Sequence, residues 1–571
     1  MQIIIKRRVD GPSIPELGTP VAITFDSVTV PLVRPSTGPA AISSYQVERA
    51  TSASGPWTVA ATGALIFGNP PVAYVDGGRL PLTTYYYRAK ASDTAGRESA
   101  YSGVVSGTTP ATVTGFNPPW PRLGAVPLND QNYDQLSQRQ HWSRFHIVCF
   151  THYNGWQVGR SLNMAQVMQD MKSRAPASLG VTPIHVIYTV KDETYTTPDG
   201  ATQRLNDKLN AENWWLRTSF PGGSIVPHEF PGNSVINDSS YCPNDASGRN
   251  WNAWKADLDI TQNRTGEAAG GGSLGNSANA YVDGLSCDVV IYKPRWEGDY
   301  NRDGTSDSRN DATIQYALRL GQKQYFDRIE AQWPGSYRLA NTDYGLIQGG
   351  ALYSASFTPN PAALAPMNGV LQGTQMEYAL SDASAPYSLE YQTRDPVNGL
   401  AGFYALRNSY NEWESAVQAP KLNIFFDHQA FRGDNPSAWQ ATRFGMACCW
   451  LLGDAYVYQQ PDSFSSALTN WADEYDNGGN GQGWMGYPVT GTYGPSKQAY
   501  DKGVYRRDFT NAVVLLNPRN NGQQTISLPF QTQRILGRSG YSDTSVNNGA
   551  VIAAGAPITL RDRDALILRR A

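Results

Sequence analysis

The stretches FHIVCFTHYNGW (145–156) and MAQVMQDMKSRA (164–175) form a β-then-α unit at the start of the long central part of the chain. In the second stretch, apolar residues repeat at i, i+3, i+4 and i+7, as in an amphipathic helix: Met164, Val167, Met168 and Met171. Further apolar segments with the character of strands follow at 184–190, 213–218, 281–292, 336–344, 369–380, 421–429 and 453–460. Eight strands with helical segments among them, such as 311–333, predict a (β/α)8 barrel.

The composition limits the classes of partner. The 571 residues include 46 Lys and Arg against 49 Asp and Glu, a net charge of −3, so we expect no nucleic-acid partner. No apolar run of about 18 residues occurs, so we expect no membrane insertion. The 32 Tyr, 15 Trp and 54 Gly indicate a loop-rich protein with many aromatic platforms, a composition that suits sugar binding. The five cysteines predict no disulfide framework.

Changes in composition and in hydrophobic periodicity along the chain predict the domain organisation. An N-terminal tether (1–16) precedes a β-sandwich (17–110) of short alternating strands. A Pro-, Thr- and Gly-rich linker (111–128) then leads into the barrel (129–505). Alternation with a period of two returns in a small C-terminal β-domain (506–571), which we expect to be a β-sandwich packed on the barrel.

The N-terminal sandwich resembles a known family. The sequences of residues 42–60 and 80–102 are similar to those of fibronectin type III domains. Tyr85 stands where that family places its tyrosine corner, and Trp57 follows a Gly-Pro turn. Val30 stands where the family usually has a core tryptophan. The resemblance implies a module that spaces or presents other domains.

Carboxylates dominate the expected carboxyl ends of the barrel strands, where such barrels build their active sites. Asp288 ends the fourth expected strand and Glu377 the sixth. Hydrolysis of a glycosidic bond requires one acid to protonate the leaving oxygen and a second carboxylate to attack the sugar or activate water. We therefore predict Asp288 and Glu377 as the catalytic pair. The alternative for Asp288 is a structural carboxylate that caps a loop or pairs with Arg295.

A second resemblance covers roughly residues 130–571. The order of Asp283-Gly284 and Asp288, the D-x-N-x-D-G loop at 299–304, Met376-Glu377 and VYRRDFTNAVVLLNP (504–518) is similar to glycoside hydrolase-like TIM barrels, in particular hypothetical glycosyl hydrolase family 15. That resemblance implies carbohydrate hydrolysis by paired acids, carried by Asp288 and Glu377. The chain departs from the family at Ser286 and Cys287, where bulky apolar residues are usual.

Other residues at expected strand ends and loops are candidates for substrate contact. Carboxylates there could bind sugar hydroxyls or cap loops, histidines could bond to hydroxyls, and indole faces could stack on pyranose rings. The predicted substrate-binding residues are Asp343, Asp427, His428, His152, Trp296, Trp471 and Glu474. Glu474 is also an alternate for the second carboxylate. His141, His146 and His152 have spacings that do not fit a zinc site.

The sequence DYNRDGTSDSRND (299–311) resembles a calcium loop, with oxygen ligands at alternate positions and a glycine for the sharp turn. The predicted ligands are Asp299, Asn301, Asp303, Thr305 and Asp307. Position twelve is Asn310 rather than Glu, so the alternative is a solvated acidic turn. We expect no required cofactor and treat Ca²⁺ as the candidate ion.

The start of the chain, MQIIIKRRVDGP, does not have the pattern of a secretory signal. A surface-polysaccharide substrate without such a signal suits a bacteriophage virion protein, so the expected partners are bacterial surface polysaccharide and other virion proteins. Two alternatives stay open. One is a non-catalytic glycan-binding or structural tail protein, and the other is a hydrolase secreted by a non-Sec route.

Overall fold

The computed structural model describes residues 11–24, 27–63, 73–77, 83–108, 116–127, 133–150, 161–195, 203–265, 279–290, 294–342, 365–380, 403–431, 434–459, 470–489, 500–538 and 541–570. The chain divides into two compact units. One unit is formed mainly by Met1–Phe116, and the other mainly by Asn117–Met485 and Asn511–Ala571. Within the described part of the chain, no helix is long and apolar enough to cross a membrane.

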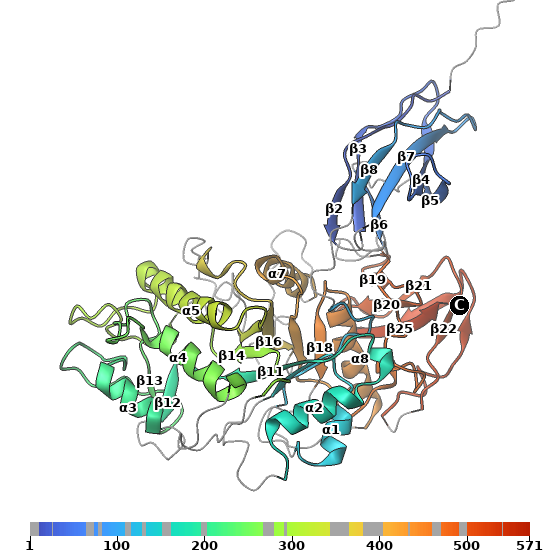
Figure 1. Ribbon diagram of the computed structural model, residues 1–571. Helices are drawn as coiled ribbons and strands as arrows, with labels where there is room; N and C mark the ends of the chain where they lie inside the picture. Colours follow the sequence, from blue (N-terminus) through green and yellow to red (C-terminus); the bar gives the residue numbers. More distant parts are fainter. Residues whose placement is uncertain are drawn as a thin grey trace, which may run out of the picture. The chain divides into compact units, whose positions relative to one another are not determined.

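The N-terminal module is a β-sandwich of two antiparallel sheets (Figure 1). One sheet contains β1 (Glu16–Leu17), β3 (Ser27–Arg34), β2 (Val21–Thr24) and β6 (Ala73–Gly77). The other contains β5 (Thr58–Gly63), β4 (Ile42–Ala50), β7 (Thr84–Asp93) and β8 (Val105–Thr108). Alternate residues of β7 are buried, as expected for a strand with one face on a core. Val30 and Tyr85 both lie in that core, so the predicted fibronectin-like sandwich is confirmed.

The central domain is a barrel of eight parallel strands, as predicted. The strands are adjacent in the order β18 (Tyr456–Gln459), β17 (Ile424–Asp427), β16 (Gly373–Leu380), β15 (Tyr337–Asn341), β14 (Gly284–Cys287), β11 (Ile184–Thr189), β10 (Ile147–Phe150) and β9 (Gly124–Ala125). A parallel bridge between Leu123 and Val457 brings the two edges together. Most of these strands are buried on both faces, because side chains fill the interior and helices cover the outside.

Two details of the barrel differ from the prediction. The segment 213–218 is not a barrel strand, because Trp215 and Arg217 instead form antiparallel bridges with Ile236 and Ile225. The missing strand is β9, which lies inside the segment predicted to be linker. Small residues are needed there, since a Cβ atom at Gly124 would lie 3.2 Å from Ile424 and from Tyr456.

Helices lie between successive strands along the central part of the chain (Figure 1). They are α1 (Leu136–Trp142), α2 (Met164–Arg174), α3 (Gln203–Glu212), α4 (Trp251–Ile260), α5 (Ala312–Gln332), α7 (Phe403–Ala416) and α8 (Pro436–Trp450). Helix α2 begins at a capping box formed by Asn163 and Gln166, and its predicted apolar stripe is buried. The long insertion between β11 and β14 contains α3, α4, β12 (Glu193–Tyr195) and β13 (Asn233–Val235), with the indoles of Trp214, Trp251 and Trp254 in a local core.

The C-terminal strands form antiparallel sheets packed on the barrel. One sheet includes, in order, β20 (Ala512–Asn517), β25 (Asp564–Arg570), β22 (Thr532–Arg534) and β23 (Val551–Ile552), and β21 (Gln524–Ser527) pairs with β24 (Pro557–Leu560). The chain between the barrel and these strands includes β19 (Tyr505–Asp508). Helix α8 contacts both β18 and β25. Its buried Arg443 donates to Asp543 (2.7 Å) and to Asp564 (2.9 Å), which fixes the helix to the C-terminal strands.

Candidate functional site

A polar layer lies inside the barrel. The side-chain Nε2 of Gln375, in β16, donates to Ser286 Oγ in β14 (2.7 Å) and contacts Cys149 Sγ in β10 (3.2 Å). All three side chains are buried, and they come from alternate strands, as the layers of such a barrel do. The departure noted in the sequence at Ser286 is therefore part of a hydrogen-bonded interior rather than a change of register.

Asp288 directly follows β14, at the carboxyl end of the barrel. It lies two residues beyond Ser286, so strand alternation places both side chains on the interior face. Burial, with a smaller contribution from the Asp288 carboxylate, raises the pKa of the interior Cys149 thiol to about 12. Asp288 has the same effect on the Cys287 thiol, so it lies close to both thiols, and its side chain is half-buried.

The backbone after Asp288 is strained. Val289 has φ of +52°, which is rare for a β-branched residue, and the Asp288 Oδ1 accepts the Val289 amide at 2.9 Å. The backbone amides of Asp288 and Val290 donate to Thr189 and Asn341 on the flanking strands. Strain of this kind concentrates at functional sites, where the surrounding structure holds a side chain in one place.

The second predicted acid, Glu377, lies in β16 two residues beyond Gln375. Its backbone is therefore near the carboxyl end of the strand that contributes Gln375 to the polar layer. The Glu377 side chain lies outside the described part, as do His152 and Asp343. The proposed roles of these three residues stay predictions.

Asp427 and His428 end β17, but they face different surroundings. Asp427 is fully buried on the outside of the barrel, where it accepts from Gln459 Nε2 (2.7 Å) and from the Gln429 amide (3.0 Å). This geometry supports the loop-capping role that the sequence left open. His428 is largely buried, and its ring packs edge-on against Phe426 with the centroids 5.9 Å apart.

Glu474 and Trp296 pack against other parts of the protein. Glu474 is buried, accepts from Asn547 Nδ2 (2.9 Å) in the C-terminal strands, and has a pKa raised by burial. Trp296 belongs to the insertion, where its ring packs against His228 with the centroids 4.4 Å apart. These contacts describe structural surroundings for both side chains.

In the predicted calcium loop, side-chain oxygens accept hydrogen bonds from backbone amides. Asp299 accepts the amides of Phe220 (2.6 Å), Asp303 (3.0 Å) and Gly304 (2.9 Å). Asp307 accepts the amides of Tyr300 and Asn301, Asn301 Oδ1 accepts from Asp303, and Asp303 Oδ1 accepts the Thr305 amide. Among the described residues, no cluster of three or more His, Cys, Asp or Glu could hold a metal ion. Binding of Ca²⁺ here stays a prediction.

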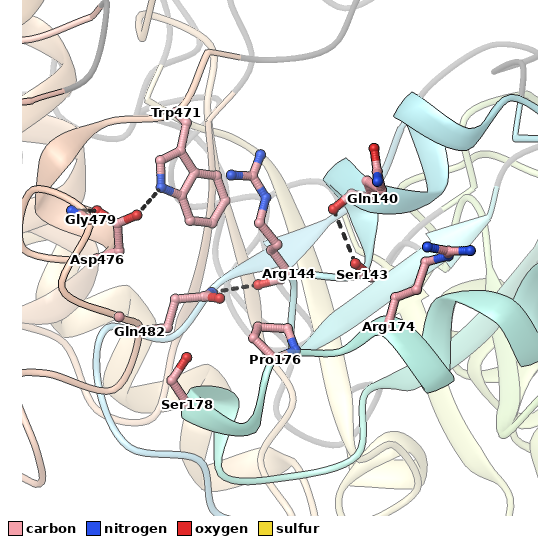
Figure 2. Close-up of a pocket in the computed structure, with 11 residues that line it drawn as sticks. Gln140, Ser143, Arg144, Arg174, Pro176, Ser178, Trp471, Asp476, Gly479 and Gln482 are labelled. Atoms are coloured by element: carbon pink, nitrogen blue, oxygen red, sulfur yellow. Dashed lines mark hydrogen bonds between the residues drawn. The ribbon is translucent and has the colours of Figure 1, made fainter.

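Trp471 lines a pocket at the amino end of the barrel strands (Figure 2). Residues that precede β10 form part of the wall, residues that precede β11 form another part, and 471–482 forms the rest. The residues are Gln140, Ser143, Arg144, Arg174, Pro176, Ser178, Trp471, Asp476, Gly479, Gly481 and Gln482. Because Asp288 follows β14 whereas residues 140–144 precede β10 and 174–178 precede β11, that part of the pocket wall and Asp288 lie at opposite ends of the barrel.

Arg144 and Gln375 were missed as functional candidates. The signal for Gln375 was its place in the expected strand, two residues before Glu377. Arg144 stands between Trp142 and Phe145 just before β10, but nothing nearby in the sequence indicates that Trp471 returns to contact it.

The solved structures that are similar to this chain include fibronectin type III domains, each of which covers about a fifth of it. No family model matches the sequence, and no curated protein matches it. The sixth fibronectin type III domain of human fibronectin type III domain containing protein 3 is 21% identical, covers 19% of this chain and 94% of its own, with a TM-score of 0.16. The fourth fibronectin type III domain of a human protein is 25% identical and covers 20% of this chain and 93% of its own, with a TM-score of 0.17. Domains A168–A170 of titin are 21% identical and cover 18% and 32%, with a TM-score of 0.14. By its own strand order, the chain combines a fibronectin type III-like β-sandwich with a TIM-like barrel, a fold consistent with an enzyme.

Proposed function

We propose that this protein is a glycoside hydrolase that cleaves bacterial surface polysaccharide with Asp288 and Glu377. The observation that carries the proposal is the position of Asp288 at the carboxyl end of β14, above a polar interior layer and beside the strained Val289. Glu377 occupies the corresponding part of β16, the next strand but one. Two acids on alternate strands at this end of a barrel are suited to glycosidic-bond hydrolysis.

The roles follow from the chemistry of the bond. One carboxyl group protonates the leaving glycosidic oxygen, and the other, as a carboxylate, attacks the anomeric carbon or removes a proton from the attacking water. The Ser286–Gln375 hydrogen bond links the two strands that carry these acids, so it positions them.

We also propose that the protein works on a bacteriophage virion. Fibronectin-like modules are frequent on such particles, and there the module would space or present the barrel toward a host surface. The remaining alternatives are a non-catalytic attachment protein built on the same barrel and a hydrolase secreted by a non-Sec route.

The experiment incubates the protein with host-surface polysaccharide and follows new reducing ends. Asp288→Asn and Glu377→Gln should each lower the rate by about 100-fold or more, because each removes an acid that acts in the transition state. Asp283→Asn is the matched control, since Asp283 precedes the same strand at the opposite end and pairs with Lys172. Unchanged cleavage in both test variants would contradict the assignment, and binding without cleavage by the wild type would favour the attachment protein.

A further inference from the structure

The pocket beside Arg144 and Trp471 is separate from the proposed catalytic site. It has a volume of about 440 Å³, within the range of pockets that hold small ligands. It lies at the amino end of β10 and β11, whereas Asp288 is at the carboxyl end of the barrel. Figure 2 shows Arg144 between Trp471 on one side and Ser143 and Arg174 on the other.

Arg144 brings a positive charge to this pocket, and the Asp476 carboxylate in the same wall acts on it electrostatically without forming an ion pair. Its Nη2 contacts His141 Nδ1 at 2.8 Å, and burial lowers the pKa of His141 to about 3, so this partner is neutral at pH 7. Burial lowers the pKa of Arg144 to about 10, which still leaves the guanidinium charged. Among the residues that the structure describes, no carboxylate forms an ion pair with Arg144. A partly buried guanidinium in this state gains most from an anionic ligand.

The wall of the pocket holds Arg144 in one orientation. The centre of its guanidinium lies 3.6 Å from the centroid of the Trp471 ring, and Gln482 Nε2 donates to the Arg144 carbonyl at 2.5 Å. Asp476 accepts from Trp471 Nε1 and from the Gly479 amide, both at 2.8 Å, so both carboxylate oxygens are engaged in fixing the wall. A guanidinium that is already oriented loses less conformational freedom when it binds a planar carboxylate.

The remaining lining groups suit a hydroxylated ring. Gln140 and Ser178 supply an amide and a hydroxyl group, whereas the Ser143 hydroxyl already donates to the Gln140 carbonyl. Arg174, which pairs with Asp170 at 2.7 Å, adds a second cation at the rim. We propose that this pocket binds a carboxylate-bearing sugar unit, with Arg144 on the carboxylate and the amide and hydroxyl groups on the ring. The choice of a sugar rests on the proposed function, but the binding itself requires no catalysis.

The test measures binding of D-glucuronate by saturation-transfer NMR, with D-glucose and inorganic sulfate as probes of the ring and the charge alone. We expect glucuronate to bind with a Kd of about 10 mM or below and at least about 10-fold more tightly than either control. The proposal is overturned if glucuronate does not bind in that range, or if glucose or sulfate binds equally well.

Two kinds of variant locate the binding. Arg144→Gln should weaken glucuronate binding by at least about 10-fold, because it removes the charged partner of the carboxylate. Ser178 is exposed and lines the pocket, so Ser178→Trp should block the pocket without removing a buried contact. The matched control is Ser173→Trp, because Ser173 is also exposed but does not line the pocket. Thermal unfolding checks that each variant is folded. Binding that survives both Arg144→Gln and Ser178→Trp would place the ligand elsewhere and overturn the proposal.

The outcome can be separated from that of the hydrolase experiment. Glucuronate binding is also measured in Asp288→Asn, where we expect the wild-type affinity because the two sites lie at opposite ends of the barrel. If the protein cleaves no glycan but still binds glucuronate, the proposed hydrolase function is wrong and the proposed binding site in the pocket is retained. Lost binding in Asp288→Asn would show that the ligand occupies the carboxyl end and would overturn the pocket.

Discussion

The two ends of the barrel differ in the surroundings of their polar side chains. At the amino end, three histidines, His141, His146 and His185, are buried, and burial lowers the pKa of each. Asp283, just before β14, accepts both Lys172 Nζ (2.7 and 2.8 Å) and the His185 amide (2.7 Å). At the carboxyl end, the interior is polar and the backbone is strained beside Asp288. One strand, β14, therefore joins an end rich in buried polar contacts to the end where we propose the catalytic site.

This difference separates stability from activity in the molecule. Substitutions at the amino end should change unfolding and leave cleavage intact, because they lie away from the proposed acids. Substitutions at the carboxyl end should do the reverse. The Arg144 pocket is the exception at the amino end, since there a charge is partly buried and no described carboxylate forms an ion pair with it.

The largest effect is expected from acid, through the buried histidines. Above pH 6.5, His146 is neutral in both folded and unfolded chains, but below it the unfolded chain gains a proton that the folded chain takes up only near pH 3. Stability should therefore fall as the pH falls through this window. His146→Asn cannot titrate, and its Oδ1 can still accept the Leu123 amide that His146 Nδ1 accepts.

The measurement is urea unfolding at a series of pH values. Between pH 6 and pH 4, His146→Asn should lose about 2–3 kcal/mol less unfolding free energy than the wild type. From pH 7 to pH 9 the two curves should run parallel, which controls for any uniform effect of the smaller side chain. An identical dependence on pH in the wild type and the variant would show that His146 does not contribute in this way.

A smaller effect should distinguish the two aspartates that flank β14. Asp283→Asn should lower the free energy of unfolding by about 1–3 kcal/mol, because it weakens a partly buried pair with Lys172. Asp288→Asn should lower it by less than about 1 kcal/mol, since Asp288 is half-buried and the Asn side-chain oxygen can still accept the adjacent Val289 amide. Equal losses in the two variants, measured by urea unfolding at pH 7, would remove the distinction between the two ends.

The sequence predicted most of the barrel because most of its strands are continuous apolar runs buried on both faces. It missed β9 because Gly124 and Ala125 are small and too few to form a pattern. It misassigned 213–218 because Trp214 and Trp215 are apolar in sequence yet pack in the core of the insertion. An apolar run by itself does not say which core it enters.

The candidate site was predictable where it follows from a strand end. Asp288 and Glu377 were located through their strands: Asp288 directly follows β14, whereas β16 continues beyond Glu377 to Leu380, and the catalytic roles of both residues stay predictions. The positions of Trp471 and Glu474 were not predictable, because they depend on long-range contacts with Arg144 and Asn547. No local spacing encodes such contacts.

The smallest effect tests the strain beside Asp288. Val289→Gly should relieve about 1–2 kcal/mol of left-handed backbone strain and lose about 0.5–1 kcal/mol to the greater flexibility of the unfolded chain, so stability should stay the same or rise slightly. Cleavage should fall, because the Asp288 carboxylate loses a fixed backbone beside it. Val290→Gly is the matched control at the next position, where a fully buried valine without positive φ is lost and stability should fall by about 2 kcal/mol or more. If Val289→Gly destabilises the barrel as much as Val290→Gly does, the strain at Val289 contributes nothing and the carboxyl end is built for stability as the amino end is.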